Sequence, residues 1–514
     1  MNDTQSVGLS FISEKLSNTI DNFWMIVSPN TLLNPFDFVH VENIHDTTTI
    51  GIVKEIKRIF LDLDSLPTKH YSSQLKLVLN QQDSFNSGIT VANVDVISNF
   101  PSIEKKSLDK TEQIDSKKVR PPPINMPVQE GKLVYFASEK EVRIALGIPQ
   151  MENPIPAGLI TMTNNTKIPI DLDISYLFGP DTTHVNATGI SGNMKTSYLL
   201  FLLQVIHNKL EDEGVSIIMF NTKEKDLLYV DKKRDKEISK EDEELLNSLD
   251  LQLTPFRNVK YFLPRGRNGS PNSAHVPEKN VTTYSYELAD VYDRLDLLFS
   301  SDFMVDPRHN IAAILNYIYE KWPMLGDNEN SKDPRRFMSW TDLYSFDDYP
   351  EEIITHKSTL LKFQGMIHRF RKPATLFVDK KVTSTYLGNE IKKMKRNEVM
   401  VIDIARLSTL EEQAFVVGDV IKTIDEMYSM GEVDYYSLDE KRVRDSSPGD
   451  LYEKKGNNKK KPKYSVILLD EVNRFLPHRI PSGSSMGGTI GGGGGGGTIG
   501  GGGGGGIGRS TVGE

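Results

Sequence analysis

Residues 189–196 read Gly189-Ile190-Ser191-Gly192-Asn193-Met194-Lys195-Thr196, and this stretch decides the fold. A short β-favouring segment, His184 to Ala187, precedes it, and an apolar helical segment, Tyr198 to Val205, follows it. Glycines between a strand and a helix allow backbone N–H groups at the helix N-terminus to meet phosphate oxygens. The order of strand, glycine loop and helix therefore predicts a phosphate-binding loop in an α/β fold.

The residue types in this loop indicate ATP with Mg²⁺ as the ligand. In such a loop Lys195 reaches the β and γ phosphates, and the Thr196 hydroxyl holds Mg²⁺. Met194 occupies the second fixed glycine of the pattern G-x-x-x-x-G-K-[ST], where glycine allows close approach of backbone and phosphate. The alternative interpretation is a strand-to-helix turn with a chance Lys-Thr pair. The predicted nucleotide-binding set is Gly189, Ile190, Ser191, Gly192, Asn193, Met194, Lys195, Thr196 and Ser197.

A second signal is an apolar strand that ends in two carboxylates. The run Val466-Ile467-Leu468-Leu469 is followed directly by Asp470 and Glu471. In P-loop enzymes such an aspartate orders the Mg²⁺ shell, and the glutamate polarises the attacking water. We therefore expect Thr196 and Asp470 at the metal, and Lys195 and Glu471 as the catalytic residues of ATP hydrolysis.

Outward from these motifs, apolar strands alternate with helices, which indicates a parallel sheet covered by helices. Continuous apolar strands, Val215 to Asn221 and Val399 to Ile404, are typical of a sheet buried on both faces. We predict a RecA-like P-loop core over 131–480, with a mostly helical insertion at about 223–397. The helices expected around and within this insertion are Ser197 to Leu210, Tyr284 to Phe299, Ile311 to Lys321, Ser358 to Phe370 and Leu410 to Met430.

The two ends of the chain differ from this core. Residues 1–130 contain short β-favouring segments separated by polar clusters, which predicts a small β-barrel or sandwich domain. Residues 481–514 contain two copies of TIGGGGGGG. Glycine has the most backbone entropy to lose and no side chain to bury, so this tail is expected to be disordered. The predicted N-terminal strands are Phe36 to Val41, Thr48 to Val53, Leu75 to Leu79 and Ile89 to Ile97.

Composition limits the class of protein without naming an activity. Hydrophobic residues make up 38% and charged residues 25%, which is ordinary for a globular protein. There is no cysteine, so the chain forms neither a disulfide nor a thiolate metal site. No apolar run of about 18 residues and no secretory leader is apparent, so we expect a cytoplasmic protein with no membrane partner. The net charge of −9 neither supports nor excludes DNA binding, and the basic run 454–463 fits either a DNA contact or a solvated loop.

Several motifs together resemble the HerA/FtsK superfamily of ATPases. The run Asp470-Glu471-Val472-Asn473-Arg474-Phe475-Leu476-Pro477 resembles the D-E-x-N-[KR]-[FY]-x-P signature of HerA-type ATPases. Residues 184–197 are similar to the HVNxxGISG…KTS loop of bacterial members. The likeness spans about residues 30–478, and its further parts, in family order, are Asn34 to Val39, Thr49 to Val53, Pro169 to Asp173, Phe220 to Lys223 and Val401 to Leu407.

The resemblance implies a homo-hexameric ring that hydrolyses ATP at subunit interfaces and passes double-stranded DNA through its pore. It also implies an effector partner, either a nuclease or a sirtuin-type NAD-consuming enzyme, in anti-phage defence or DNA-end processing. That partner would dock on the N-terminal barrel, which resembles the barrel of ATP-synthase subunits and is of the HAS-like type.

Two departures from the family keep a second hypothesis open. Met194 replaces a glycine, and the glycine-rich tail stands where the family has further strands, a polar sensor and an arginine finger. Arg509, which follows the glycine runs within that tail, is the one arginine there that could take the finger's place. The leading hypothesis is a DNA translocase, and the alternative is a nucleotide-binding ring scaffold that regulates an effector with little motor activity. A P-loop kinase or small-molecule NTPase fits poorly with the N-terminal barrel and the chain length.

Overall fold

The structure is a computed structural model, and its description covers most of the two predicted domains. Four loop residues, 190–193, the segment 60–87 with the strand predicted at Leu75 to Leu79, and the tail from 476 onward lie outside the described residues. The chain forms two compact units, one of Met1–Asp290 with Pro373–Glu471 and one of Val291–Lys372 with Val472–Glu514. The described residues are 6–13, 15–29, 31–59, 88–101, 126–178, 183–189, 194–233, 238–252, 254–299, 310–321, 339–345, 357–370, 376–429, 462–472 and 475.

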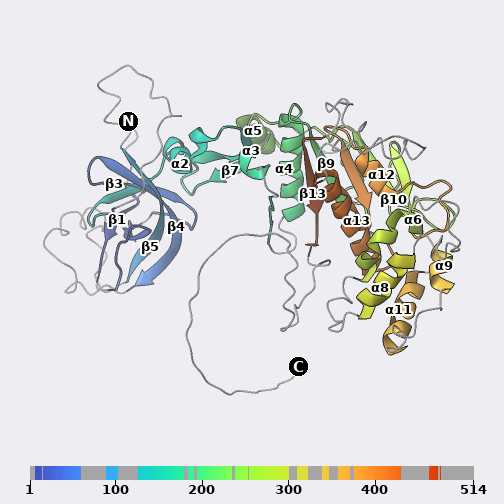
Figure 1. The fold of residues 1–514 in the computed structure, drawn as a ribbon. Helices are drawn as coiled ribbons and strands as arrows, with labels where there is room; N and C mark the ends of the chain where they lie inside the picture. The colour runs from blue at the N-terminus through green and yellow to red at the C-terminus, as the bar shows by residue number, and fades with distance from the viewer. Residues whose placement is uncertain are drawn as a thin grey trace, which may run out of the picture. The chain divides into compact units, whose positions relative to one another are not determined.

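The N-terminal part is a closed antiparallel barrel, drawn mostly in blue in Figure 1. The strand order is β1-β2-β5-β4-β3-β6. Closure comes from β6, which lies just past residue 130 and pairs with both β1 and β3, so that Val134 faces Gly8 on one side and Val41 on the other. The predicted alternative of barrel or sandwich thus resolves to a barrel. Its strands are β1 (Gly8–Phe11), β2 (Asn22–Val27), β3 (Phe38–Asn43), β4 (Thr47–Ile59), β5 (Ile89–Pro101) and β6 (Leu133–Phe136).

The barrel closes around a small apolar core because one face of each strand points inward. Phe23, Met25 and Val94 are fully buried in this core. The register of β4 against β5 shifts between Ile50 and Gly51, and such a bulge bends a long strand as closure requires. A Cβ at Gly51 would lie 2.4 Å from Val94 Cγ1, so the bend needs a residue without a side chain there.

The C-terminal strands form a five-stranded parallel sheet of order β11-β10-β12-β9-β13. Every residue of β9 and β12 is buried, which confirms the prediction of a sheet covered on both faces. The sheet strands are β9 (Val215–Asn221), β10 (Val259–Pro264), β11 (Val281–Tyr284), β12 (Val399–Asp403) and β13 (Tyr464–Leu469).

Two of these strands, β10 and β11, lie inside the segment that we expected to be a mostly helical insertion. The segment 223–397 therefore supplies part of the sheet as well as helices. Both strands are short, and β10 ends at a proline, so their apolar patterns do not stand out from the surrounding loops. They form because each finds a parallel neighbour, β10 beside β12 and β11 beside β10.

Helices in the same unit cover the sheet. Helix α4 buries Leu202, Val205 and Ile206 in one cluster with Ile217 and Met219 of β9. The helices predicted at Ser197 to Leu210 and Leu410 to Met430 are confirmed as α4 and α13. The remaining elements are α2 (Glu139–Ala145), η3 (Ile148–Gln150), β7 (Pro154–Thr161), β8 (Lys167–Asp173), α3 (Ile174–Leu177), α4 (Lys195–Lys209), α5 (Lys240–Ser248), α6 (Leu288–Val291), α12 (Leu387–Lys392) and α13 (Leu410–Ser429).

The second unit is helical in its described part. It contains the 3₁₀ helix η4 (Tyr292–Phe299), α8 (Asn310–Lys321), α9 (Trp340–Ser345) and α11 (Lys357–Phe370). Phe299 of η4 packs on Phe363 of α11, with ring centroids 5.1 Å apart. The predicted helices at Ile311 to Lys321 and Ser358 to Phe370 are confirmed. The one predicted over Tyr284 to Phe299 is broken, because Arg294 has φ −129° and interrupts the helix.

The prediction of a strand at His184 to Ala187 is wrong in this structure. Residues 183–189 form neither a strand nor a helix, and most are exposed. A strand needs a hydrogen-bonded neighbour, and four residues of mixed polarity find none among the described strands. Within the described residues, no helix has the length and apolar character needed to cross a bilayer.

Candidate nucleotide-binding site

The parallel sheet brings polar residues from three strands to one edge. Leu469 of β13 is in register with Phe220 of β9, and Asp403 of β12 is in register with Asn221. Asp470 follows β13 directly, so it emerges beside the end of β9. The carboxyl ends of parallel strands are the usual place for ligands in α/β proteins because all of them open at the same edge.

Helix α4 begins at this edge without a side-chain cap. Met194 is its N-cap residue and makes no side-chain capping hydrogen bond. The first N–H groups of a helix have no partner within the helix, and together with the helix dipole they attract anions. Lys195 and Thr196 occupy the first turn of this 15-residue helix, and Ser197 follows on an exposed position.

Met194 itself adopts the left-handed conformation, with φ 54° and ψ 20°. Its side chain extends into solvent, and the residue is 77% exposed. Glycine adopts this conformation without steric cost, whereas a residue with a Cβ is strained there. The phosphate-loop pattern therefore favours glycine at this position for two reasons. Glycine adopts the left-handed conformation without strain, and it allows the phosphate to approach the backbone closely.

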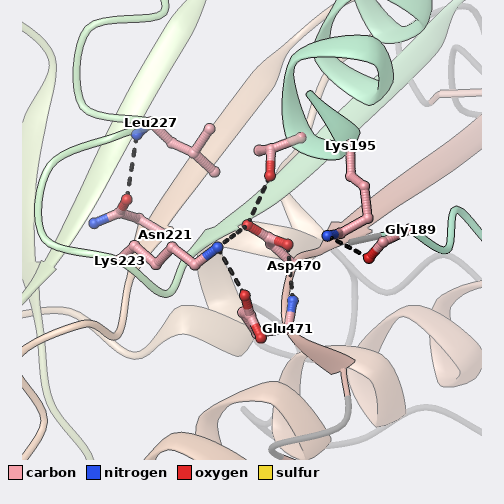
Figure 2. Close-up of polar contacts among 8 residues, drawn as sticks. Gly189, Lys195, Asn221, Lys223, Leu227, Asp470 and Glu471 are labelled. Carbon is pink, nitrogen blue, oxygen red and sulfur yellow. Dashed lines mark hydrogen bonds and ion pairs between the residues drawn. The ribbon is translucent and has the colours of Figure 1, made fainter. Parts of the chain in front are cut away.

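Lys195 folds back over the loop. Its Nζ donates a hydrogen bond of 2.9 Å to the Gly189 carbonyl oxygen, which spans the loop residues 190–193 (Figure 2). The lysine and the first glycine of the predicted loop are thus at its two ends and in contact. The other four predicted loop residues, Ile190, Ser191, Gly192 and Asn193, lie outside the described residues.

A direct hydrogen bond joins the two motifs that the sequence separates. The Thr196 hydroxyl donates to Asp470 Oδ2 over 3.0 Å, although the residues are 274 positions apart in the chain. A hydroxyl and a carboxylate at one point are hard oxygen donors of the kind that Mg²⁺ prefers. The described residues contain no group of three or more His, Asp or Glu side chains able to hold a metal alone.

Glu471 turns the chain away from β13. It has φ 55°, another left-handed residue at this edge, and its N–H donates to Asp470 Oδ1 over 2.9 Å. Non-glycine residues with positive φ are uncommon and concentrate at functional sites. The Glu471 side chain is 36% exposed, so water can reach its carboxylate.

Lys223 is the member of the site that the sequence did not assign. Its Nζ lies 3.2 Å from Asp470 Oδ2 and 2.8 Å from Glu471 Oε1, and Figure 2 shows this side chain reaching both carboxylates. The hydrogen bond to Glu471 is the main reason that the pKa of Lys223 is raised, with Asp470 adding to it. Its signals in the sequence are its position just after β9 and its place in the resembling segment Phe220 to Lys223, and neither assigns it a role in the site.

The neighbours of Asp470 stabilise the ionised form of its carboxylate. Burial acts to raise the pKa of Asp470, but the hydrogen bonds from Lys223 and Thr196 outweigh it, and the pKa lies below its usual value. Asp470 therefore stays ionised through the neutral range and is available as an acceptor for a cation. Both the lysine and the threonine bond the same oxygen, Oδ2.

A buried polar network lies beneath the site. The Asn221 amide donates to Asp403 Oδ1 and to the Glu224 carbonyl oxygen, each over 2.8 Å, and its Oδ1 accepts from the Leu227 N–H over 3.2 Å. Asp403 is fully buried and also accepts from Ser273 and from the Ala405 N–H. Burial is the main influence on Asp403 and raises its pKa despite these hydrogen bonds.

Comparison with known proteins does not assign this site. No protein-family model matches the chain, and no curated protein matches its sequence. The geometry of the described residues is therefore the basis on which its chemistry is inferred.

Proposed function

We propose that the chain is a Mg²⁺-dependent P-loop ATPase with a RecA-like core, of the HerA/FtsK type that its motifs resemble, and that ATP hydrolysis drives movement along double-stranded DNA. The observation that carries the proposal is the hydrogen bond from Thr196 to Asp470. These two residues were predicted from separate motifs to share one metal ion. Their contact supports the pairing of the two motifs over a chance Lys-Thr turn.

The residues at the sheet edge fit Mg²⁺ and the phosphates of ATP. Thr196 and Asp470 would hold the metal, and Lys195 with the N-terminal N–H groups of α4 would bind the phosphate oxygens. When bound, Mg²⁺ neutralises charge on the β and γ phosphates. Lys195, Thr196 and Asp470 would together hold the nucleotide phosphates and their metal ion at this edge of the sheet.

Glu471 is the general base in this proposal. Its carboxylate is partly exposed at the same edge and one residue from Asp470. It would orient the attacking water and accept its proton, while the departing ADP keeps its contacts to Lys195. Asp470 is assigned to the metal, so Glu471 is the carboxylate left for proton transfer.

The assembly in the proposal follows the resemblance. A homo-hexameric ring would surround double-stranded DNA, and an effector, a nuclease or a sirtuin-type NAD-consuming enzyme, would dock on the barrel of β1 to β6. Anti-phage defence and DNA-end processing are the two settings that this arrangement suits.

Two observations favour the second candidate, a ring scaffold that binds nucleotide and turns it over slowly. Met194 places a side chain at the glycine position of the loop, and Lys223 neutralises the carboxylates on which hydrolysis depends. A scaffold of this kind would regulate its effector through nucleotide occupancy, with little dependence on DNA.

Steady-state ATP hydrolysis with and without duplex DNA separates the two candidates. A motor is expected to hydrolyse ATP faster with DNA, and Glu471→Gln is expected to lower the rate by about 10²–10⁴-fold because it removes the general base. Nucleotide binding by Glu471→Gln should remain, since Lys195 and Thr196 are unchanged.

A matched control is Glu243→Gln, which removes the same charge from an exposed position of α5. It should leave the rate unchanged. A wild-type rate that is negligible and insensitive to both DNA and Glu471→Gln, with nucleotide still bound, would reject the motor in favour of the scaffold. No nucleotide binding at all would reject both.

A further inference from the structure

The ammonium of Lys223 contacts the same Asp470 oxygen, Oδ2, that the Thr196 hydroxyl contacts. Asp470 Oδ2 accepts from both the Thr196 hydroxyl and Lys223 Nζ, and Lys223 also pairs with Glu471 Oε1. Thr196 and Asp470 are the residues assigned to Mg²⁺ above. The inference that follows therefore rests on the proposed nucleotide site.

Lys223 is held in this place by the turn that carries it. Asn221 is fully buried, and its side chain ties the turn at two points, the Glu224 carbonyl and the Leu227 N–H. Figure 2 shows the second of these contacts. Asp403 fixes the Asn221 amide from the neighbouring strand. The backbone at Lys223 is thus anchored to β9 and β12, and the lysine is directed at the carboxylates by a rigid support.

Lys223 cannot neutralise both carboxylates of the site. Asp470 and Glu471 carry two negative charges, and Lys223 supplies one positive charge. A divalent cation arriving beside Asp470 would lie next to the ammonium, and like charges repel strongly in a partly buried site. Binding of the metal and retention of the lysine contact to Asp470 therefore oppose each other.

We propose that Lys223 is an internal counter-ion that competes with Mg²⁺ for Asp470 and Glu471 and so sets the Mg²⁺ requirement of nucleotide binding. Without nucleotide, Lys223 holds both carboxylates and keeps Glu471 from activating water. When Mg²⁺ arrives with the nucleotide phosphates, the lysine leaves Asp470, and Glu471 becomes available as the base. Lys223 is a positioning residue in this scheme, since it acts through the two carboxylates.

The test measures binding of a fluorescent ADP analogue as a function of free Mg²⁺. Lys223→Met removes the competing charge and keeps most of the side-chain volume, so half-saturation should occur at about tenfold lower Mg²⁺. Lys223→Arg keeps the positive charge that competes with the metal ion and should stay within about twofold of wild type. Because hydrolysis plays no part, the result does not depend on turnover.

Lys225→Met is the matched control. Lys225 belongs to the same turn, but its ammonium lies over the Tyr229 ring, 5.9 Å from the centroid, and not at the carboxylates. Its removal should leave the Mg²⁺ midpoint unchanged, and this excludes a general effect of lost surface charge. Lys223 is 45% exposed, so Lys223→Met is expected to fold, and circular dichroism with the Lys223→Arg comparison checks this.

The outcomes separate the inference from the function on which it rests. If wild type binds the analogue with Mg²⁺ and Lys223→Met has the same or a higher Mg²⁺ midpoint, the counter-ion role is wrong and the nucleotide site stands. An equal shift in Lys225→Met would also overturn it. If wild type binds no analogue at any Mg²⁺ concentration, the proposed function fails and the inference fails with it.

Discussion

The barrel and the parallel sheet handle their buried polar groups in opposite ways. In the barrel, buried polar side chains pair at separate points, as Asn43 does with Thr49 and Ser10 with the Gln129 carbonyl. In the sheet, Asn221, Asp403 and Asp470 meet from three different strands at one edge. Antiparallel strands alternate in direction and disperse their ends, whereas parallel strands collect their carboxyl ends. The direction of the strands therefore determines where polar side chains gather in the fold.

The largest expected effect comes from replacing one buried methionine with alanine in the core of the barrel and one in the core of the sheet. Met25 of β2 and Met219 of β9 are both fully buried. Replacing either with alanine should lower local stability by about 2–5 kcal/mol. Native-state hydrogen exchange would measure the loss strand by strand.

Only the sheet variant should also weaken nucleotide binding. Met219 is in register with Leu468 and Val401, so a cavity there shifts the strands that carry Asp470 and Asn221. Met25→Ala should leave the affinity unchanged. Equal losses of affinity in both variants would show that strand direction does not locate the site.

A smaller effect is expected from pH and Asp403. Burial raises the pKa of this carboxyl in the folded chain, so the stability it contributes is present below the unfolded pKa and is lost as pH rises through the folded pKa. Asp403→Asn does not titrate. The difference in urea midpoint, variant minus wild type, should therefore increase from about pH 4 to about pH 8.

The same substitution also removes an acceptor for Asn221 and Ser273, so its absolute stability is expected to be lower than that of wild type. The prediction concerns how the difference in urea midpoint changes with pH, and not the size of that difference at any one pH. A flat difference across this range would mean that Asp403 is ionised in the fold with no penalty.

The smallest effect concerns the left-handed N-cap of α4. Met194→Gly removes the strain of φ 54°, whereas Met194→Ala keeps a Cβ and the strain. The glycine variant should be more stable than the alanine variant by about 1 kcal/mol, as hydrogen exchange of α4 would report. An alanine variant that is the more stable of the two would show that the loop is not held in this conformation.

Sequence pattern predicted the parts of the fold that have a strong local signal. Val215–Asn221 and Val399–Asp403 are continuous apolar runs, and both are the central strands expected of them. Strand β1 has only four residues, and β10 and β11 are bounded by loops, so their pairing arises from tertiary partners that no local pattern contains. For the same reason His184 to Ala187 has strand-like residues but no strand.

The candidate site was predictable in its motifs and not in its contacts. Lys195 and Thr196 are recognisable from the glycine loop that precedes a helix, and Asp470 and Glu471 from the apolar strand that ends in two carboxylates. Lys223 reaches Asp470 across 247 positions of sequence, and nothing local to Lys223 indicates which carboxylate it will meet. Strand register decides that contact.

The most direct test of a nucleotide site at this sheet edge is an equilibrium titration of wild type and Lys195→Ala with ATP and Mg²⁺ by calorimetry. Wild type should bind, and Lys195→Ala should bind about 10–100-fold more weakly, because each charge-assisted hydrogen bond to phosphate contributes about 1.5–3 kcal/mol. Equal affinity of the two proteins, or no binding by wild type, would contradict the account.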